Sequence, residues 1–110
     1  MEKFVKGDVI VLPFPFSDLS STKKRPALVV ADLPGDDVIL AQITSAERFD
    51  EYAISLNIED FKAGGLPHPS KIRPNKLFTV DRSIISYKIG SLKENKIRDV
   101  EGMLVKIFRG

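Results

Sequence analysis

The sequence predicts a mainly β protein, a small and strongly bent antiparallel β-barrel with one α-helix at its C-terminal end. Short apolar runs, most of them rich in valine and isoleucine, alternate with segments rich in Gly, Pro and Asp, which is the pattern of strands joined by turns. Only the last segment has the spacing of an amphipathic helix. The 110 residues suffice for one hydrophobic core, and many short strands with a single helix favour a barrel.

Three strands are expected in the first half of the chain, at residues 9–12, 27–31 and 38–44. The first run, VIVL, is apolar without alternation, as expected for a strand buried on both faces or for one in a small barrel. Pro13 and Pro15 lack the amide hydrogen that a ladder requires, so regular pairing is expected to end there. The three strands predict an antiparallel meander with a long first loop.

The second half of the chain is less regular. Its alternating run and its Gly-Pro-rich segment predict a strand and a loop. The expected elements, in order, are a strand at residues 52–56, a helical turn at 58–61, a loop at 63–69, two short strands at 70–73 and 77–81 around Pro74-Asn75, and a strand at 87–90.

The C-terminal segment predicts the helix. Ser91 and Glu94 have the spacing of a capping box, which predicts the start of the helix at this point. Apolar side chains then recur on one face, which we expect to pack on the sheet. That face comprises Ile97, Val100, Leu104 and Ile107, with Met103 and Phe108 beside it.

Composition excludes several kinds of function. There is no cysteine, so disulfides, thiolate metal sites and cysteine nucleophiles are excluded, and a reducing cytoplasm is expected. No acidic or histidine cluster has metal-site spacing, and no phosphate-cradling glycine loop is present, so neither a metal nor another cofactor is expected. We expect no signal peptide and no membrane association, because no apolar stretch is long enough. The net charge of only +2 means that an anionic partner must be attracted by local clusters.

Arg25, Thr44 and Ser45 are the residues that point most directly to chemistry. Arg25 precedes the second strand, and its guanidinium is a planar fork of donors that matches phosphate oxygens. The third strand ends at Thr44 and Ser45, which supply hydroxyls. If the strands pair in order, these ends converge on a phosphodiester-binding site, with cleavage as a further hypothesis. The alternatives are an ordinary exposed cation and a turn-forming Thr-Ser pair.

Other residues are candidates for binding a nucleic-acid strand. Lys23 and Lys24 flank Arg25 and can neutralise phosphates, unless they are simply solvated. A second basic cluster consists of Lys71, Arg73, Lys76 and Arg82, and possible stacking surfaces are Phe14, Phe16 and Phe78. Phenylalanines on strands are more often part of the core. For His68, the single histidine, we expect a structural or exposed position.

The whole chain resembles the PemK/MazF-like toxin family of type II toxin–antitoxin systems. The resemblance rests on short motifs that follow the family's order along the chain. They are Gly7-Asp8-Val9, Pro13-Phe14-Pro15-Phe16-Ser17-Asp18, Arg25-Pro26-Ala27-Leu28-Val29, Ile43-Thr44-Ser45, Ser70-x-Ile72-Arg73, Leu77-x-Thr79-Val80-Asp81 and Ile89-Gly90-Ser91-Leu92. In place of the family's glycine-rich loop with an acidic residue, this chain has Ser20-Ser21-Thr22-Lys23-Lys24.

The resemblance implies a homodimeric SH3-like barrel and a metal-independent endoribonuclease that cuts single-stranded RNA at short sequences. It implies that Arg25 and Thr44 form the catalytic pair. We expect RNA contacts from Lys23, Lys24, Ser45, Phe16, Arg73 and Lys76. A cognate antitoxin with an acidic, partly disordered tail is the expected protein partner, and a loop at residues 15–24 is expected to be mobile until a ligand orders it. The alternatives are a non-catalytic binding protein on the same barrel, such as a gyrase inhibitor, and an inactive member that binds only an antitoxin.

Overall fold

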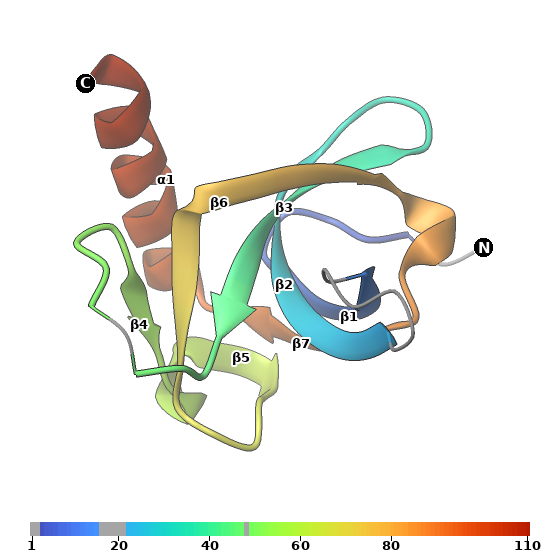
Figure 1. Cartoon of the computed structure of the whole chain (residues 1–110), viewed down its shortest axis with the longest axis horizontal. Coiled ribbons are helices and arrows are strands. Elements are labelled where there is room, and N and C mark those ends of the chain that lie inside the picture. Colours follow the sequence, from blue (N-terminus) through green and yellow to red (C-terminus); the bar gives the residue numbers. More distant parts are fainter. Residues whose placement is uncertain (1–2, 16–21, 48) are drawn as a thin grey trace.

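A single antiparallel sheet curls around the core, and one helix packs beside it (Figure 1). The computed structural model describes residues 3–15, 22–47 and 49–110. In this part of the chain the sheet has seven strands in the order β4-β6-β3-β2-β1-β7-β5. The elements are β1 (Asp8–Pro15), β2 (Thr22–Asp32), β3 (Asp37–Thr44), β4 (Ile54–Leu56), the 3₁₀ turn η1 (Ile58–Asp60), β5 (Phe61–Gly64), β6 (Ser70–Asp81), the 3₁₀ turn η2 (Arg82–Ile84), β7 (Tyr87–Leu92) and α1 (Glu94–Arg109). The expected mainly β class and the C-terminal helix are confirmed.

The apolar run of β1 explains how so small a sheet encloses a core. β1 lies between β2 and β7, and β2 pairs with β3, so the expected meander is confirmed. Successive side chains of a strand point to opposite faces. Val9 packs into one apolar cluster, whereas Ile10 and Leu12 pack into another. A run without alternation is therefore required, because both faces of β1 are covered.

The expectation that Pro13 and Pro15 end the pairing is wrong. β1 continues to Pro15, and Pro13 lies opposite Lys24 in the register with β2. The pairing with β7 reaches only Val11. Beyond that point β1 has a partner on one side, where a proline is tolerated if its missing N–H would face away from the partner strand.

The stretch from Ser70 to Asp81 is one strand, β6, and not two. Its register with β3 jumps from Leu77 opposite Ala41 to Arg73 opposite Gln42. Pro74, Asn75 and Lys76 thus form an irregularity within β6, and the strand bends sharply there in Figure 1. A bulge accommodates the proline without ending the strand. The loop expected at residues 63–69 likewise begins later, because β5 extends to Gly64.

The helix starts without the expected capping box. Ser91 belongs to β7, and its Oγ donates a hydrogen bond to Oδ1 of Asp8 at 3.2 Å. The N-cap is Lys93, with no side-chain cap. The buried carboxylate of Asp8 also accepts from the Val5 amide at 2.9 Å, so Ser91 satisfies a buried acceptor instead of the helix end.

The apolar stripe of the helix packs on the sheet as far as Leu104. Val100 is buried, and Ile97 and Leu104 pack against the same cluster as Val9. Phe108 is 74% exposed on the last turn, which projects past the sheet (Figure 1). Among the described residues, no helix combines the length and apolar character needed to span a bilayer.

Candidate functional site

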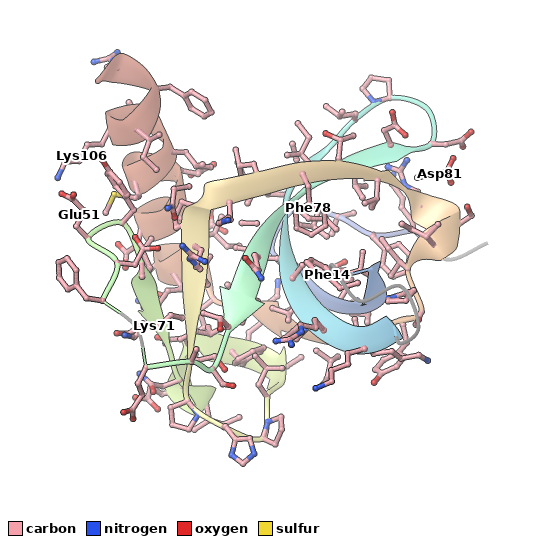
Figure 2. All side chains as sticks on the ribbon, viewed as in Figure 1. Phe14, Glu51, Lys71, Phe78, Asp81 and Lys106 are labelled. Atoms are coloured by element: carbon pink, nitrogen blue, oxygen red, sulfur yellow. The ribbon has the colours of Figure 1, made fainter. Side chains whose placement is uncertain are left out.

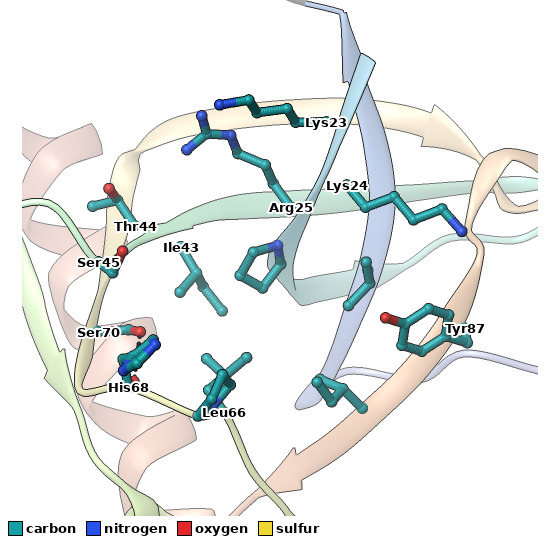
Figure 3. Close-up of a pocket in the computed structure, with 14 residues that line it drawn as sticks. Lys23, Lys24, Arg25, Ile43, Thr44, Ser45, Leu66, His68, Ser70 and Tyr87 are labelled. Atoms are coloured by element: carbon teal, nitrogen blue, oxygen red, sulfur yellow. Dashed lines mark hydrogen bonds between the residues drawn. The ribbon is translucent and has the colours of Figure 1, made fainter. Parts of the chain in front are cut away.

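An open hollow of about 440 Å³ lies where the start of β2 meets the end of β3 (Figure 3). Four segments supply most of its walls: the start of β2, the end of β3, the loop between β5 and β6, and β7. The lining residues are Val11, Lys23, Lys24, Arg25, Pro26, Ile43, Thr44, Ser45, Leu66, Pro67, His68, Ser70, Tyr87 and Ile89.

Strand register brings Arg25 and Thr44 to this hollow. The ladder between β2 and β3 pairs Ala27 with Gln42. Arg25 and Thr44 each lie two residues beyond this last pair, at the start of β2 and the end of β3. Residues two apart on a strand point to the same face, and both residues line the hollow. The expected convergence of the two strand ends is therefore present in the structure.

Two hydroxyl groups of the hollow are held by local hydrogen bonds. Oγ1 of Thr44 accepts from the Ala46 amide at 3.1 Å, which is the turn-forming arrangement considered for this residue. A hydroxyl that accepts a hydrogen bond still has its own hydrogen to donate. Oγ of Ser70 donates to the carbonyl of His68 at 3.0 Å, and Ser45 is exposed. Thr44 thus offers the hollow a hydroxyl donor whose oxygen is held in place.

The described part of the lining is cationic. It contains Lys23, Lys24 and Arg25 and no acidic residue. Both lysines lie on β2, whereas the sequence predicts them on the preceding loop. They are exposed, and Nζ of Lys24 lies 5.8 Å from the ring centroid of Tyr87. Because no carboxylate of the described lining opposes these charges, the hollow is suited to an anion.

Gly64 fixes the direction in which the loop between β5 and β6 leaves the sheet. Its φ is +68°, and a Cβ at this position would lie 2.1 Å from the carbonyl oxygen of Ile89. A side chain cannot occupy that space, so the position requires glycine. The loop that follows carries Leu66, Pro67 and His68 to the hollow.

Arg73 and Lys76 are not brought to this hollow. Nε of Arg73 donates to Oδ2 of Asp50 at 2.9 Å, and the two side chains are 19% and 7% exposed. Arg73 and Asp50 line a smaller neighbouring hollow of about 170 Å³ that also touches Thr44. Lys76 is exposed in the irregular part of β6. The RNA contacts of Arg73 and Lys76 stay a prediction.

The pKa of Asp50 lies below its ordinary value of 3.8. Burial by itself raises this pKa, but hydrogen bonds and charge outweigh the burial. The carboxylate accepts from the Tyr52 amide and from Arg73, interacts with the positive charge of Arg73, and is bonded by Asn75. The ion pair therefore ties the loop after β3 to β6, next to Thr44.

Phe14 and Phe78 do not offer the exposed stacking surface considered for them. Phe14 and Phe78 meet edge to face, with ring centroids 5.0 Å apart, and pack against the cluster that contains Ile10 and Leu12 (Figure 2). Both rings are partly buried, so they lie at the margin of the core. Phe16 and most of the expected mobile loop, residues 16–21, lie outside the described residues.

Sequence reasoning misses His68, Ser70 and Tyr87 as residues of this hollow. His68 is exposed, which is one of the two positions expected for it, but it lies on the rim of the hollow. Tyr87 lies at the hollow because β7 pairs with β1, which sets Tyr87 opposite Val11. No local sequence pattern announces that pairing. Among the described residues, no group of three or more His, Asp or Glu side chains is placed to hold a metal ion.

Comparison with family models identifies a family. The model of the family described as "PemK-like, MazF-like toxin of type II toxin-antitoxin system" matches residues 5–108. No curated protein matches the sequence.

Solved structures share the fold at low sequence identity. MazF from Deinococcus radiodurans has a TM-score of 0.76 at 17% identity, with all of both chains covered. An endoribonuclease from a mycobacterial species, solved with its cognate antitoxin, has a TM-score of 0.74 at 14% identity, covering 96% of this chain and 95% of the other. The Mycobacterium tuberculosis toxin MazF-mt6 has a TM-score of 0.72 at 18% identity, covering 93% and 96%.

Proposed function

Because the chain belongs to the PemK-like, MazF-like toxin family of type II toxin–antitoxin systems, we propose that it is an endoribonuclease that cleaves single-stranded RNA without a metal ion. The observation that carries the proposal is that Arg25 and Thr44 line the same hollow, whose described lining is cationic. Two of the similar structures are themselves described as endoribonucleases. Cleavage of mRNA at short sequences would account for toxicity through loss of translation.

The proposed reaction needs only the groups of the RNA and the hollow. The ribose 2′-oxygen attacks the adjacent phosphorus and passes its proton to a non-bridging phosphoryl oxygen, and the bond from phosphorus to the 5′-oxygen breaks. The 5′-oxygen takes up a proton, which leaves a 2′,3′-cyclic phosphate and a 5′-hydroxyl. No water nucleophile has to be generated, so positioning and charge stabilisation carry the catalysis.

Arg25 and Thr44 have distinct roles in this proposal. The guanidinium of Arg25 stabilises the charge that develops on the phosphoryl oxygens and assists the leaving 5′-oxygen. The hydroxyl of Thr44, held by the Ala46 amide, donates to a phosphoryl oxygen. Lys23, Lys24 and Ser45 contact the flanking backbone.

Replacement of Arg25 tests the assignment. Arg25→Ala should lower the rate of RNA cleavage by at least about 10²-fold, the scale for losing one preorganised donor. Arg25→Lys should recover only part of the rate, because an ammonium lacks the planar fork. Arg98→Ala is the matched control, since Arg98 is 72% exposed on α1 and is not part of the lining. Near-normal cleavage by Arg25→Ala would refute the role of this residue.

We further propose a homodimer and an antitoxin as the protein partners. An acidic, disordered antitoxin tail would compete with RNA for Lys23 and Lys24 and would become ordered on binding. Apolar side chains remain exposed in the single chain, among them Val105 at 51% and Phe108 at 74%. Surface of this kind supports association through a symmetric interface.

A further inference from the structure

Tyr87 presents an aromatic ring at one end of the hollow. The residue is 46% exposed although its ring belongs to the lining. Figure 3 shows the ring across the hollow from Thr44 and Ser45, with its hydroxyl directed toward the interior. An exposed aromatic ring in a cationic groove is typical of sites that bind single-stranded nucleic acids.

The two ends of the hollow differ in character. Thr44, Ser45, His68 and Ser70 make one end polar, and Arg25 lies beside it. Beside Tyr87 the lining includes the apolar residues Val11, Pro26 and Ile89. A nucleotide has the same division, with an anionic phosphate and a flat, largely apolar base. The volume of about 440 Å³ lies within the range of about 300–1,000 Å³ for small-molecule sites, and it suits a single nucleotide.

The contact with Lys24 shows that a face of the ring is accessible. Nζ of Lys24 stands 5.8 Å from the centroid, a cation–π distance at an exposed position, where the interaction is weak. A base can therefore displace the ammonium from the ring at little cost. The released Lys24 is then beside a bound strand, where it can meet a phosphate.

We propose that Tyr87 is the stacking platform for the nucleobase next to the phosphate held by Arg25 and Thr44. The inference rests on the proposed function and adds a binding role for a residue outside the catalytic pair. Stacking is tolerant of base identity, because every base has a π-face. Tyr87 would then contribute to affinity for single strands generally and would not set the cleavage sequence.

Tyrosine fluorescence gives a direct readout, because the chain has two tyrosines and no tryptophan. The probe is a short 2′-fluoro RNA of randomised sequence, which lacks the attacking hydroxyl and stays intact. We expect saturating probe to quench the emission of the wild type and of Tyr52→Phe, the control at a residue outside the lining. Tyr87→Phe, which emits through Tyr52 alone, should bind the probe without this quenching. Equal quenching in Tyr87→Phe would overturn the proposal.

Affinity at several salt concentrations separates stacking from charge. Tyr87→Leu should weaken binding of the same probe by about 5- to 150-fold, whereas Tyr87→Phe should remain within about 2-fold. The line of log affinity against log salt should shift for Tyr87→Leu without a change of slope, because the lysines and Arg25 still neutralise the same phosphates. Thermal unfolding of each variant verifies folding, and the fluorescence of Tyr87→Phe gives the answer if Tyr87→Leu does not fold.

The two proposals fail in different ways. If the wild type cleaves RNA and Tyr87→Leu binds the probe with unchanged affinity, the stacking role is overturned and the nuclease proposal stands. Quenching that depends on Tyr87 in a protein that does not cleave RNA overturns the nuclease and supports the stacking role. A wild type that does not bind the probe overturns the stacking role.

Discussion

The ion pair between Asp50 and Arg73 gives a stability prediction that follows from the structure alone. Loss of one member of a buried pair costs about 3–5 kcal/mol, because the other charge stays buried. Arg73 keeps 19% of its side chain exposed, so Asp50→Ala is expected near the lower end, at about 3 kcal/mol. Asp50→Asn keeps an oxygen for the Tyr52 amide and should lose about 1.5 kcal/mol, as a charged hydrogen-bond partner becomes neutral.

The pH dependence of these variants follows from the lowered pKa of Asp50. The pKa of Asp50 is higher in the unfolded chain than in the folded protein. The ionised carboxylate therefore contributes its full stabilisation above pH 3.8. That contribution is lost as the pH falls from 3.8 through the lower pKa of the folded state. Asp50→Asn should therefore lower stability at neutral pH and show a flatter decline in acid.

Urea unfolding followed by circular dichroism measures both effects. We expect the midpoint to fall and the slope of free energy against urea to stay constant. Asp99→Ala, an exposed acidic residue on α1, is the control and should change stability little. An exposed ion pair contributes less than about 0.5 kcal/mol. If Asp50→Ala lowers the free energy of unfolding by less than this, Asp50 and Arg73 do not act as a buried pair.

Two further predictions concern binding and assembly. The double variant Lys23→Ala/Lys24→Ala should bind RNA more weakly across all sequences, and its salt slope should become shallower by about 0.7 for each phosphate that the variant no longer neutralises; coincident lines for variant and wild type would mean that these lysines do not touch RNA. Light scattering at micromolar concentration should give twice the protomer mass, and the mass of one chain would contradict the proposed homodimer.

Local sequence patterns predict the features of the fold that depend on residues close together in the chain. The uninterrupted VIVL run predicts a strand covered on both faces, and the spacing of Ile97 and Val100 predicts the packed face of the helix. The order of the first three strands then suffices to bring Arg25 and Thr44 to one place. The hydrophobic pattern and the order of neighbouring strands therefore predict that Arg25 and Thr44 lie in one site.

The departures arise where partners distant in the sequence decide the outcome. Ser91 has the spacing of a helix cap, but its hydroxyl donates a hydrogen bond to Asp8, which is 83 residues away in the sequence. Pro13 continues a strand because β7 has already left that side of β1. Tyr87 joins the hollow only through the register of β7 with β1. None of these long-range pairings can be read from one chain's local pattern.

Analysis of the cleavage products tests the central claim most directly. Purified protein is incubated with single-stranded RNA in excess EDTA, and the ends of the fragments are identified by mass spectrometry. The account predicts fragments that end in a 2′,3′-cyclic phosphate and begin with a 5′-hydroxyl, and their absence when the RNA carries 2′-fluoro in place of the hydroxyl. Intact RNA, or fragments that begin with a 5′-phosphate, would contradict it.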